Sequence, residues 1–262
     1  MSDAVATQTV QTTLENNVLW IRLNRPESMN AVNGELRAAL AAAVRDADRN
    51  PEARVVVVTG TGRAFCAGAD VREFATREGA VEEIRGEYER ILTGLRNMPK
   101  PVIAALNGVA AGIGASIAMA CDLRFATPEA ALVEAFVKIG LTPDGGASWF
   151  LPRFIGAARA FELMYTGDPL PAAEAERLGL YNRVVAGDQL EATVRELAER
   201  LATGPAMALA AAKRSVNFSV NSTFEEALDF EFLLQAVQMQ GQDFKEGVTA
   251  FLEKRKPSFK GE

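Results

Sequence analysis

Two glycine-containing stretches, RAFCAGADV at residues 63–71 and NGVAAGIGA at residues 107–115, decide the fold of this chain. An apolar run rich in β-branched or small residues precedes each of them, at 54–59 and 101–105, and predicts a buried strand. After the second stretch, residues 113–120 predict a helix. Both stretches are therefore expected where strands end, because glycine permits tight turns and close backbone packing there.

A further apolar run at 18–23 predicts another buried strand, and helical patterns lie between the three runs. Asn33 is expected to cap the first helix. The buried faces of the two helices are expected to be Leu36, Leu40, Val44 and Ala47 in the first, and Val81, Ile84, Tyr88, Ile91, Leu95 and Met98 in the second. This alternation of strand and helix predicts an α/β fold with parallel crossovers.

The remaining sequence predicts short strands at 123–125 and 131–133, where the sheet is expected to end. From Gly145 onward the pattern is helical and is interrupted by glycine and proline. A core at 1–195 and a C-terminal helical region at 196–262 are therefore expected.

Composition excludes several classes of function. The chain has 262 residues, 48% of them apolar and 24% charged, which is typical of a globular protein. Its net charge of −6 disfavours nucleic acid as a partner. No apolar run has membrane-spanning length and residues 1–15 lack a signal-peptide pattern, so a cytoplasmic location is expected.

The chain contains no histidine, so any proton transfer must use a carboxylate, lysine, tyrosine or cysteine. This absence also disfavours Ser and Cys triads and most zinc sites. The two cysteines, Cys66 and Cys121, have no metal-type spacing partner and are expected to be small buried side chains. No metal site is predicted.

The glycine spacing at residues 108–114 also occurs in the nucleotide loop of short-chain dehydrogenases. In those enzymes the loop follows the first strand and a tyrosine precedes a lysine by four residues. Here the loop comes after residue 100, and the three tyrosines are followed at that distance by Leu92, Pro169 and Val185. This disfavours an oxidoreductase. Taken singly, each glycine stretch is also compatible with a purely structural turn.

Taken together, the two stretches resemble the two signatures of the enoyl-CoA hydratase/isomerase family, the crotonase superfamily. LNRP at 23–26 and MNA at 29–31 resemble its N-terminal loop, and the similarity continues at 140–146, 246–248 and 251–255. It covers nearly the whole chain. The resemblance implies a crotonase-type ββα spiral core at 1–195 and a helical oligomerisation region at 196–262, in a homotrimer or a dimer of trimers.

By the same resemblance, the substrate is an acyl-coenzyme A thioester and no separate cofactor is implied. The backbone N–H groups of Ala67 and Ile113 correspond to an oxyanion hole, in which preset donors stabilise negative charge on the thioester oxygen. Ile113 stands where many hydratases have glycine, which narrows the space for the acyl chain.

The glutamate pair that hydratases of this family use is missing, because Ser116 and Phe136 occupy the corresponding positions. Ser116 is expected to pack or to bond to backbone, and Glu134 becomes catalytic only after a local shift in the alignment. Asp144, in GLTPDGG at 140–146, resembles the proton-transferring aspartate of the isomerase branch that includes epoxyphenylacetyl-CoA isomerase. Its alternative role is that of a turn or helix-capping residue.

The coenzyme is expected to contact two backbone segments and one basic side chain. The resemblance assigns this role to Ser28, Met29, Ala31, Gly68, Ala69, Asp70, Val71, Gly112 and Lys254. Lys254 is expected to reach a phosphate from a neighbouring subunit, and a solvated helix end is its alternative. Phe136, with Trp149 and Phe150, is a candidate for the acyl pocket, although aromatic side chains at such spacings are more often core.

The expected function is therefore isomerisation of an enoyl-CoA or epoxyphenylacetyl-CoA in fatty-acid or aromatic-acid catabolism, because a single carboxylate suits a proton shuttle. Two alternatives remain open. One is a hydratase that adds water to a trans-2-enoyl-CoA, and the other is an acyl-CoA-binding homologue with little turnover.

Overall fold

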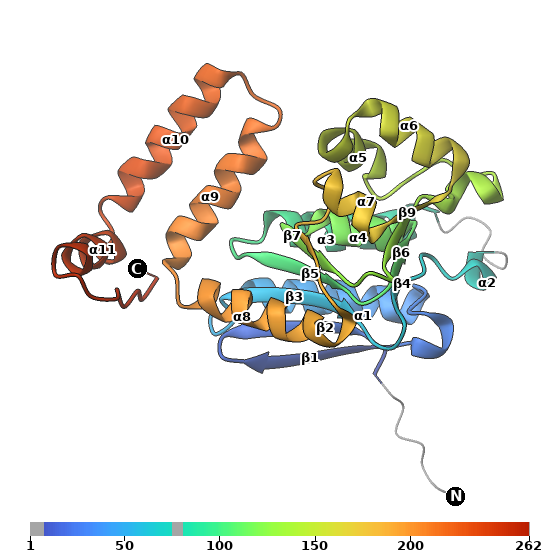
Figure 1. Ribbon diagram of the computed structural model, residues 1–262, viewed down its shortest axis with the longest axis horizontal. Coiled ribbons are helices and arrows are strands. Elements are labelled where there is room, and N and C mark those ends of the chain that lie inside the picture. The colour runs from blue at the N-terminus through green and yellow to red at the C-terminus, as the bar shows by residue number, and fades with distance from the viewer. Residues whose placement is uncertain (1–7, 75–80, 262) are drawn as a thin grey trace, which may run out of the picture.

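The fold, seen in a computed structural model that describes residues 8–74 and 81–261, is α/β with two sheets (Figure 1). The larger sheet has the order β1-β2-β3-β5-β7-β10 and the smaller one the order β4-β6-β8-β9. The strands of the larger sheet are β1 (Val10–Glu15), β2 (Val18–Leu23), β3 (Val55–Gly60), β5 (Val102–Leu106), β7 (Leu123–Ala126) and β10 (Arg183–Val184). Those of the smaller sheet are β4 (Ala64–Cys66), β6 (Val109–Ala111), β8 (Ala131–Val133) and β9 (Pro169–Pro171).

Helices connect and cover these strands. They are α1 (Gly34–Arg49), α2 (Val71–Phe74), α3 (Val81–Asn97), α4 (Ile113–Ala120), α5 (Ala147–Ile155), α6 (Ala157–Thr166), α7 (Ala172–Arg177), α8 (Leu190–Ala202), α9 (Ala206–Ser219), α10 (Phe224–Gln238) and α11 (Gln242–Leu252). Three short 3₁₀ turns, η1 (Pro26–Ser28), η2 (Ala135–Ile139) and η3 (Gly187–Gln189), complete the described elements.

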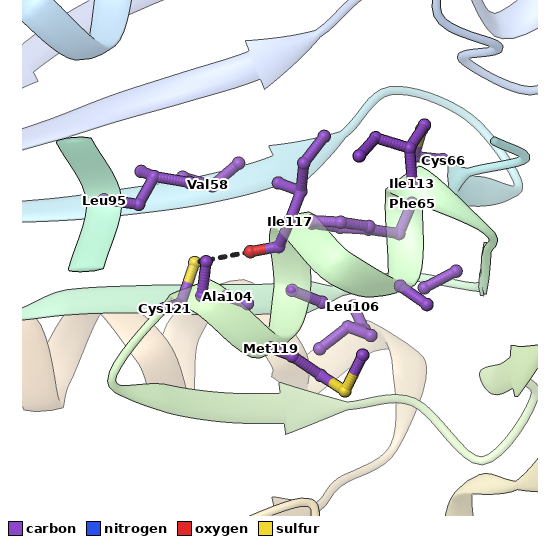
Figure 2. Close-up of a cluster of buried hydrophobic side chains, with 14 of the residues drawn as sticks. Val58, Phe65, Cys66, Leu95, Ala104, Leu106, Ile113, Ile117, Met119 and Cys121 are labelled. Carbon is purple, nitrogen blue, oxygen red and sulfur yellow. Dashed lines mark hydrogen bonds between the residues drawn. The ribbon is translucent and has the colours of Figure 1, made fainter. Parts of the chain in front are cut away.

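The core forms because the central strands are apolar on both faces. All six residues of β3 are buried, and β3 pairs in parallel with β2 and β5, as the continuous apolar runs predict. Helix α1 begins as expected, with the side chain of Asn33 accepting a hydrogen bond from Leu36 N–H. Figure 2 shows the apolar side chains of α4, including Ile113 and Ile117, packed among those of the neighbouring strands. Helix α4 is thus anchored at the centre of the molecule.

The predicted strands and helices of the core are present, but the sheets extend further than expected. The N-terminal strand β1 pairs antiparallel with β2. Beyond residue 133, β9 pairs with β8 and β10 pairs with β7, so the prediction that the sheet ends there is wrong. These late strands have two or three residues each, too few for a periodic pattern.

The boundary expected at residue 195 falls inside α8. Four residues of α8, namely Leu190, Val194, Ala198 and Ala202, are buried against the larger sheet. The helical region therefore begins after α8, with α9. In contrast, α9 and α10 contain no fully buried residue, although the side chain of Lys213 in α9 reaches Asp122, and Figure 1 shows the two helices as a hairpin that projects from the core. None of the described helices is both long and apolar enough to cross a membrane.

Candidate active site

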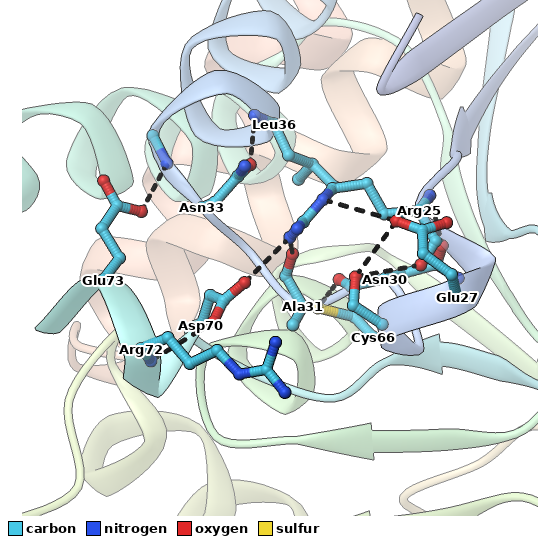
Figure 3. A network of polar contacts seen from close by, with 12 residues as sticks. Arg25, Glu27, Asn30, Ala31, Asn33, Leu36, Cys66, Asp70, Arg72 and Glu73 are labelled. Atoms are coloured by element: carbon cyan, nitrogen blue, oxygen red, sulfur yellow. Dashed lines mark hydrogen bonds and ion pairs between the residues drawn. The ribbon is translucent and has the colours of Figure 1, made fainter. Parts of the chain in front are cut away.

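The buried side chain of Asn30 holds the loop after β2 against the segment after β3. Its amide nitrogen donates hydrogen bonds to the carbonyl oxygens of Thr61, Ala64 and Phe65, at 3.0, 2.8 and 3.2 Å. Its side-chain oxygen accepts from the N–H of Arg25 at 2.9 Å. Figure 3 shows Asn30 beside Arg25 and Cys66. Asn30 has a positive φ of 57°, which asparagine tolerates better than most residues. Sequence reasoning did not single out Asn30 or Arg25.

The same loop pairs with residues 67–70 through the backbone. Val32 N–H donates to Gly68 O at 2.7 Å, and Asp70 N–H donates to Val32 O at 3.0 Å. In this parallel bridge the partner of Val32 is Ala69, so the N–H of Ala69 points to the other side. No described residue accepts a hydrogen bond from it. Ala69 thus offers a free backbone donor.

Ala67 differs from its prediction as an oxyanion donor. Its N–H already donates to Met29 O at 3.0 Å, which makes it part of the pairing that holds the loop. Gly68 between the two residues has a positive φ of 98°, which breaks the regular alternation of N–H directions, so Ala67 N–H faces the loop while Ala69 N–H faces away from it. Ala67 N–H is therefore engaged within the fold, and Ala69 N–H is the free donor of this segment among the described residues.

The second donor lies at the beginning of α4. Gly112 N–H donates to Val133 O at 2.9 Å and thereby fixes the turn that precedes the helix. Ile113 is the first residue of α4, so its N–H has no carbonyl partner within the helix, and no other described residue accepts from it. The positive end of the helix dipole adds to its attraction for an anion.

The two donor segments touch through backbone atoms because glycine stands at the contacts. A Cβ atom on Gly114 would lie 2.4 Å from Cys66 O, and one on Gly68 would lie 3.0 Å from Ala111 O. A side chain at Gly114 would therefore push the segments apart. These contacts bring the segment that carries the Ala69 N–H against the segment that carries the Ile113 N–H.

Asp144 lies in the loop that packs on the first turn of α4. Ser116 Oγ donates to the carbonyl oxygen of Asp144 at 3.2 Å, which confirms the expectation that Ser116 bonds to backbone. A Cβ on Gly145 would lie 2.6 Å from Ile113 Cδ1. Asp144 is exposed, yet desolvation by its surroundings raises the pKa of its carboxyl above the usual value. The backbone of this loop is thus held against the first turn of α4.

A cavity of about 610 Å³ opens beside Asp144. Helix α3 forms one wall and the 144–146 loop with the start of α5 forms the other. The apolar lining includes Trp149 and Phe150, whose rings meet edge to face with centroids 5.1 Å apart. Phe136 lies elsewhere, with its ring 3.5 Å from where a Cβ on Gly112 would be. Trp149 and Phe150 therefore shape this cavity, and Phe136 covers the turn before α4.

Glu134 is fully buried, and neither of its carboxylate oxygens has a hydrogen-bond partner among the described residues. Burial, and secondarily the charge of Asp144, raise the pKa of Glu134 to about 8. At neutral pH it is therefore mostly a neutral carboxylic acid close to Asp144. It does not line the cavity beside Asp144.

The residues expected to contact coenzyme A lie mostly along one edge. Ser28 Oγ donates to Arg25 O at 3.3 Å, and Ala31 O accepts from Arg25 Nη1 at 2.6 Å. The same guanidinium forms an ion pair with Asp70 at 3.2 Å, as Figure 3 shows. Met29 and Val71 are exposed, at 39% and 56%. Arg25 thus joins the two backbone segments predicted to hold the coenzyme.

Lys254 is separate from this edge. It follows α11, and Figure 1 shows α11 at the opposite end of the molecule from α2 and β4. The chain therefore does not bring its own Lys254 to the site, and only the version of the prediction that uses a neighbouring subunit remains. Among the described residues no cluster of acidic, cysteine or histidine side chains is suited to a metal ion.

Comparisons with known proteins agree with this geometry. Residues 13–262 match the family model of enoyl-CoA hydratase/isomerase. The chain is 39% identical over 253 residues to 1,2-epoxyphenylacetyl-CoA isomerase of Escherichia coli, covering 95% of this chain and 97% of the relative. It is 36% identical over 248 residues to crotonyl-CoA hydratase of Syntrophomonas wolfei, covering 94% and 95%.

The fold gives the same result. A crystal structure of enoyl-CoA hydratase from Bacillus anthracis superposes with a TM-score of 0.91 at 34% identity, covering 97% of this chain and 100% of that one. An enoyl-CoA hydratase structure from Mycobacterium smegmatis gives 0.92 at 30% identity, with 97% and 99% covered. Sequence and fold together show that the chain is an acyl-CoA enzyme of the enoyl-CoA hydratase/isomerase family, with the crotonase fold.

Proposed function

We propose that this enzyme isomerises an acyl-CoA, moving a proton between two carbons of the acyl group with Asp144 as the base. The observation that supports the proposal is that Asp144 lines the cavity and that the next residue, Gly145, packs against the side chain of Ile113. The positions of the hydratase glutamate pair hold Ser116, which is bonded to the Asp144 loop, and Phe136. One carboxylate suffices for a proton shuttle.

The proposed reaction uses the two backbone N–H donors together with the carboxylate of Asp144. The thioester oxygen lies between the N–H groups of Ala69 and Ile113, which stabilise the charge that develops on it. Asp144 takes a proton from one carbon of the acyl group, and the electron pair of the broken C–H bond moves toward the thioester oxygen. The carboxylic acid of Asp144 then returns the proton to a different carbon. The raised pKa of Asp144 makes it a stronger base for this step.

The coenzyme part of the substrate is proposed to lie along Ser28, Met29 and Ala31 on one side and residues 68–71 on the other. Backbone groups there bind the adenine and pantetheine portions. The exposed side chains of Met29 and Val71 provide apolar contact area. Gly112, at the turn before α4, leaves room for the thioester.

Assembly is proposed to occur through the C-terminal helices, as a homotrimer or a dimer of trimers. Helices α9 and α10 contain no fully buried residue, and their apolar side chains Phe224, Phe232 and Leu233 are 62–74% exposed. Such a surface is typical of an interface. A neighbouring copy would also supply Lys254. Light scattering of the purified protein measures the assembly directly, and a monomer at micromolar concentration would contradict it.

The decisive experiment is deuterium exchange at the α-carbon of a thioester panel, together with double-bond migration in a 3-enoyl-CoA. Asp144→Asn is expected to lower both rates about 100- to 10,000-fold, with acyl-CoA binding retained. The control is Asp168→Asn, because that carboxylate lies on the surface beside Lys138. Wild-type protein that binds thioesters tightly but exchanges no proton would instead support a binding homologue.

Hydration of a 2-enoyl-CoA is the second candidate, and Glu134 is the observation that favours it. A buried, neutral carboxylic acid close to an ionised carboxylate is the arrangement from which acid and base roles arise. Loss of crotonyl-CoA absorbance at a rate above that of isomerisation, abolished by Glu134→Gln, would place hydration first. Glu129→Gln is the matched control, because Glu129 is exposed near the same strand.

A further inference from the structure

The cavity beside Asp144 contains a cation without a partner. Arg96, near the end of α3, is half-buried and lines this cavity. Its guanidinium forms no hydrogen bond or ion pair with any described residue. A guanidinium has five N–H donors, and those of half-buried Arg96 stay accessible from the cavity. Arg96 can therefore donate hydrogen bonds to an anionic group of a ligand in this cavity.

Arg96 lies at the far end of the cavity from the reacting groups. Tyr88, Leu92 and Arg96 follow one another at spacings of four residues along one face of α3. Tyr88 is close to Asp144, because the charge of Asp144 adds to burial in raising the pKa of Tyr88. The Cα atoms of Tyr88 and Arg96 are about 12 Å apart, since each helical residue advances about 1.5 Å. A chain that starts at Asp144 thus reaches Arg96 after crossing the cavity.

The guanidinium of Arg96 is held in place by an aromatic side chain. Its central carbon lies 4.3 Å from the ring centroid of Trp149 and 5.8 Å from that of Phe150. Such stacking fixes the plane of the guanidinium and leaves its N–H edge available. Arg153 lies at 4.2 Å from the same Trp149 ring. Positive charge is therefore concentrated at this end.

Nearby carboxylates do not neutralise this charge. Asp122 is paired with Lys213 at 2.9 Å and also accepts from Val102 N–H. Burial lowers the pKa of Arg96, an effect that Asp122 partly offsets and Arg153 reinforces. Glu89 also lines the cavity, but it is one of its exposed residues. The far end thus carries the half-buried cation Arg96, while Arg85, an exposed cation one turn before Tyr88, lines the cavity nearer to Asp144.

We propose that the acyl group of the preferred substrate ends in a carboxylate, which pairs with Arg96 at the far end of the cavity. The substrate is then a coenzyme A thioester of a dicarboxylic acid, with its thioester carbon next to Asp144. This arrangement also sets the orientation of the acyl chain. In the reverse orientation the terminal carboxylate of the acyl group would lie beside the carboxylate of Asp144. The inference rests on the proposed acyl-CoA function and names its substrate class.

The competing occupant is a long apolar chain. Arg96 and Trp149 also line a second cavity of about 510 Å³, whose walls include Met119, Leu209 and Val220. A methyl-terminated chain that displaced Arg96 would run into this space. Such a chain would leave the guanidinium without an acceptor, so the position of Arg96 favours the carboxylate.

The test is calorimetric binding of matched saturated thioesters to the intact protein. Each pair differs only in its end group: adipyl-CoA with hexanoyl-CoA, suberyl-CoA with octanoyl-CoA, and sebacyl-CoA with decanoyl-CoA. Wild type is expected to bind one carboxylate member about 10- to 100-fold more tightly than its methyl partner. Arg96→Met is expected to remove this preference, and Arg96→Lys to keep part of it. Arg153→Met, which removes the other cation from Trp149, is expected to keep it.

The outcomes separate this inference from the proposed function. Equal binding of both members of every pair, or tighter binding of the methyl members, would overturn the carboxylate assignment and leave acyl-CoA binding intact. An unchanged preference in Arg96→Met would overturn the role of Arg96. Failure to bind any thioester would overturn the proposed function itself, and this inference with it.

Discussion

The two halves of the candidate site are built in different ways. The donor half, residues 65–70 and 108–114, consists of backbone N–H groups placed by glycine contacts and by the buried side chain of Asn30. The carboxyl half, residues 134–146, consists of side chains whose ionisation depends on burial. This difference implies that added side-chain volume should disturb the donor half, whereas changes of charge should disturb the carboxyl half. Substitutions can test this division.

The largest effect is expected from a single added methyl group in the donor half. Gly114→Ala places a Cβ against the carbonyl oxygen of Cys66 and should lower the free energy of unfolding by about 3 kcal/mol or more. Gly86→Ala is the control, because nothing lies within 4 Å of a Cβ there, and it should stabilise α3 by about 1 kcal/mol. Urea denaturation measures both. Similar stabilities for the two variants would contradict the close backbone contact.

In the carboxyl half, an effect of similar size should appear as the pH rises. The pKa of Glu134 is raised from 4.5 to about 8 in the fold, so the folded state binds more protons than the unfolded state between these values. Wild-type stability should therefore fall as pH rises from 4.5 to 8. Glu134→Gln removes this titration and should gain roughly 4 to 5 kcal/mol relative to wild type by pH 9.

Thermal melting from pH 5 to pH 9 measures this difference. Glu129→Gln, at an exposed position, should follow wild type at every pH. If the gap between Glu134→Gln and wild type stayed constant over the range, Glu134 would not titrate as its burial requires.

A smaller effect on the rate of proton exchange is expected from the hydrogen bond that joins α4 to the Asp144 loop. Ser116→Ala removes the hydrogen bond from Ser116 Oγ to Asp144 O, which is worth about 1 kcal/mol. The α-proton exchange rate should fall about fivefold, with unchanged acyl-CoA binding. Ser148→Ala, at an exposed position in α5, should have no effect. Isotope exchange under saturating thioester distinguishes the two variants.

The smallest effect on catalysis is expected when only the side chain of a residue with a donor backbone N–H is changed. Ile113→Val keeps the N–H and removes one methyl group beside Gly145, so exchange should remain within about threefold of wild type. Stability should fall by about 1 kcal/mol, as for Ile117→Val one turn later. A hundredfold loss of exchange in Ile113→Val alone would show that its side chain, and not only its backbone, takes part.

Sequence motifs predicted only part of the arrangement of the candidate site. Glycine spacing and residue order predicted that the two glycine-containing segments follow strands, and the structure adds that they touch and that the Asp144 loop packs on α4. The motifs did not identify which N–H in 67–70 faces the site, since that depends on the pairing of Ala69 with Val32. Nor did they reveal that Glu134 is buried without partners, which is a property of packing.

The fold was predictable to a similar extent. Long apolar runs such as β2 and β3 are specified by their own residues. The short strands β9 and β10 form only because β8 and β7 offer an edge to pair with, and no local pattern records this. The extent of the core also depends on contacts distant in sequence, since α8 belongs to it through burial on the larger sheet.

The reactivity of Cys66 can report local opening of the donor half. Its thiol is buried under Gly114, and burial raises its pKa to about 12, so an alkylating reagent finds almost no thiolate while the segments stay together. Alkylation therefore has to wait for a local opening that separates residues 65–70 from α4. The labelling rate of Cys66 would measure how often the oxyanion hole comes apart, and a bound thioester should slow it.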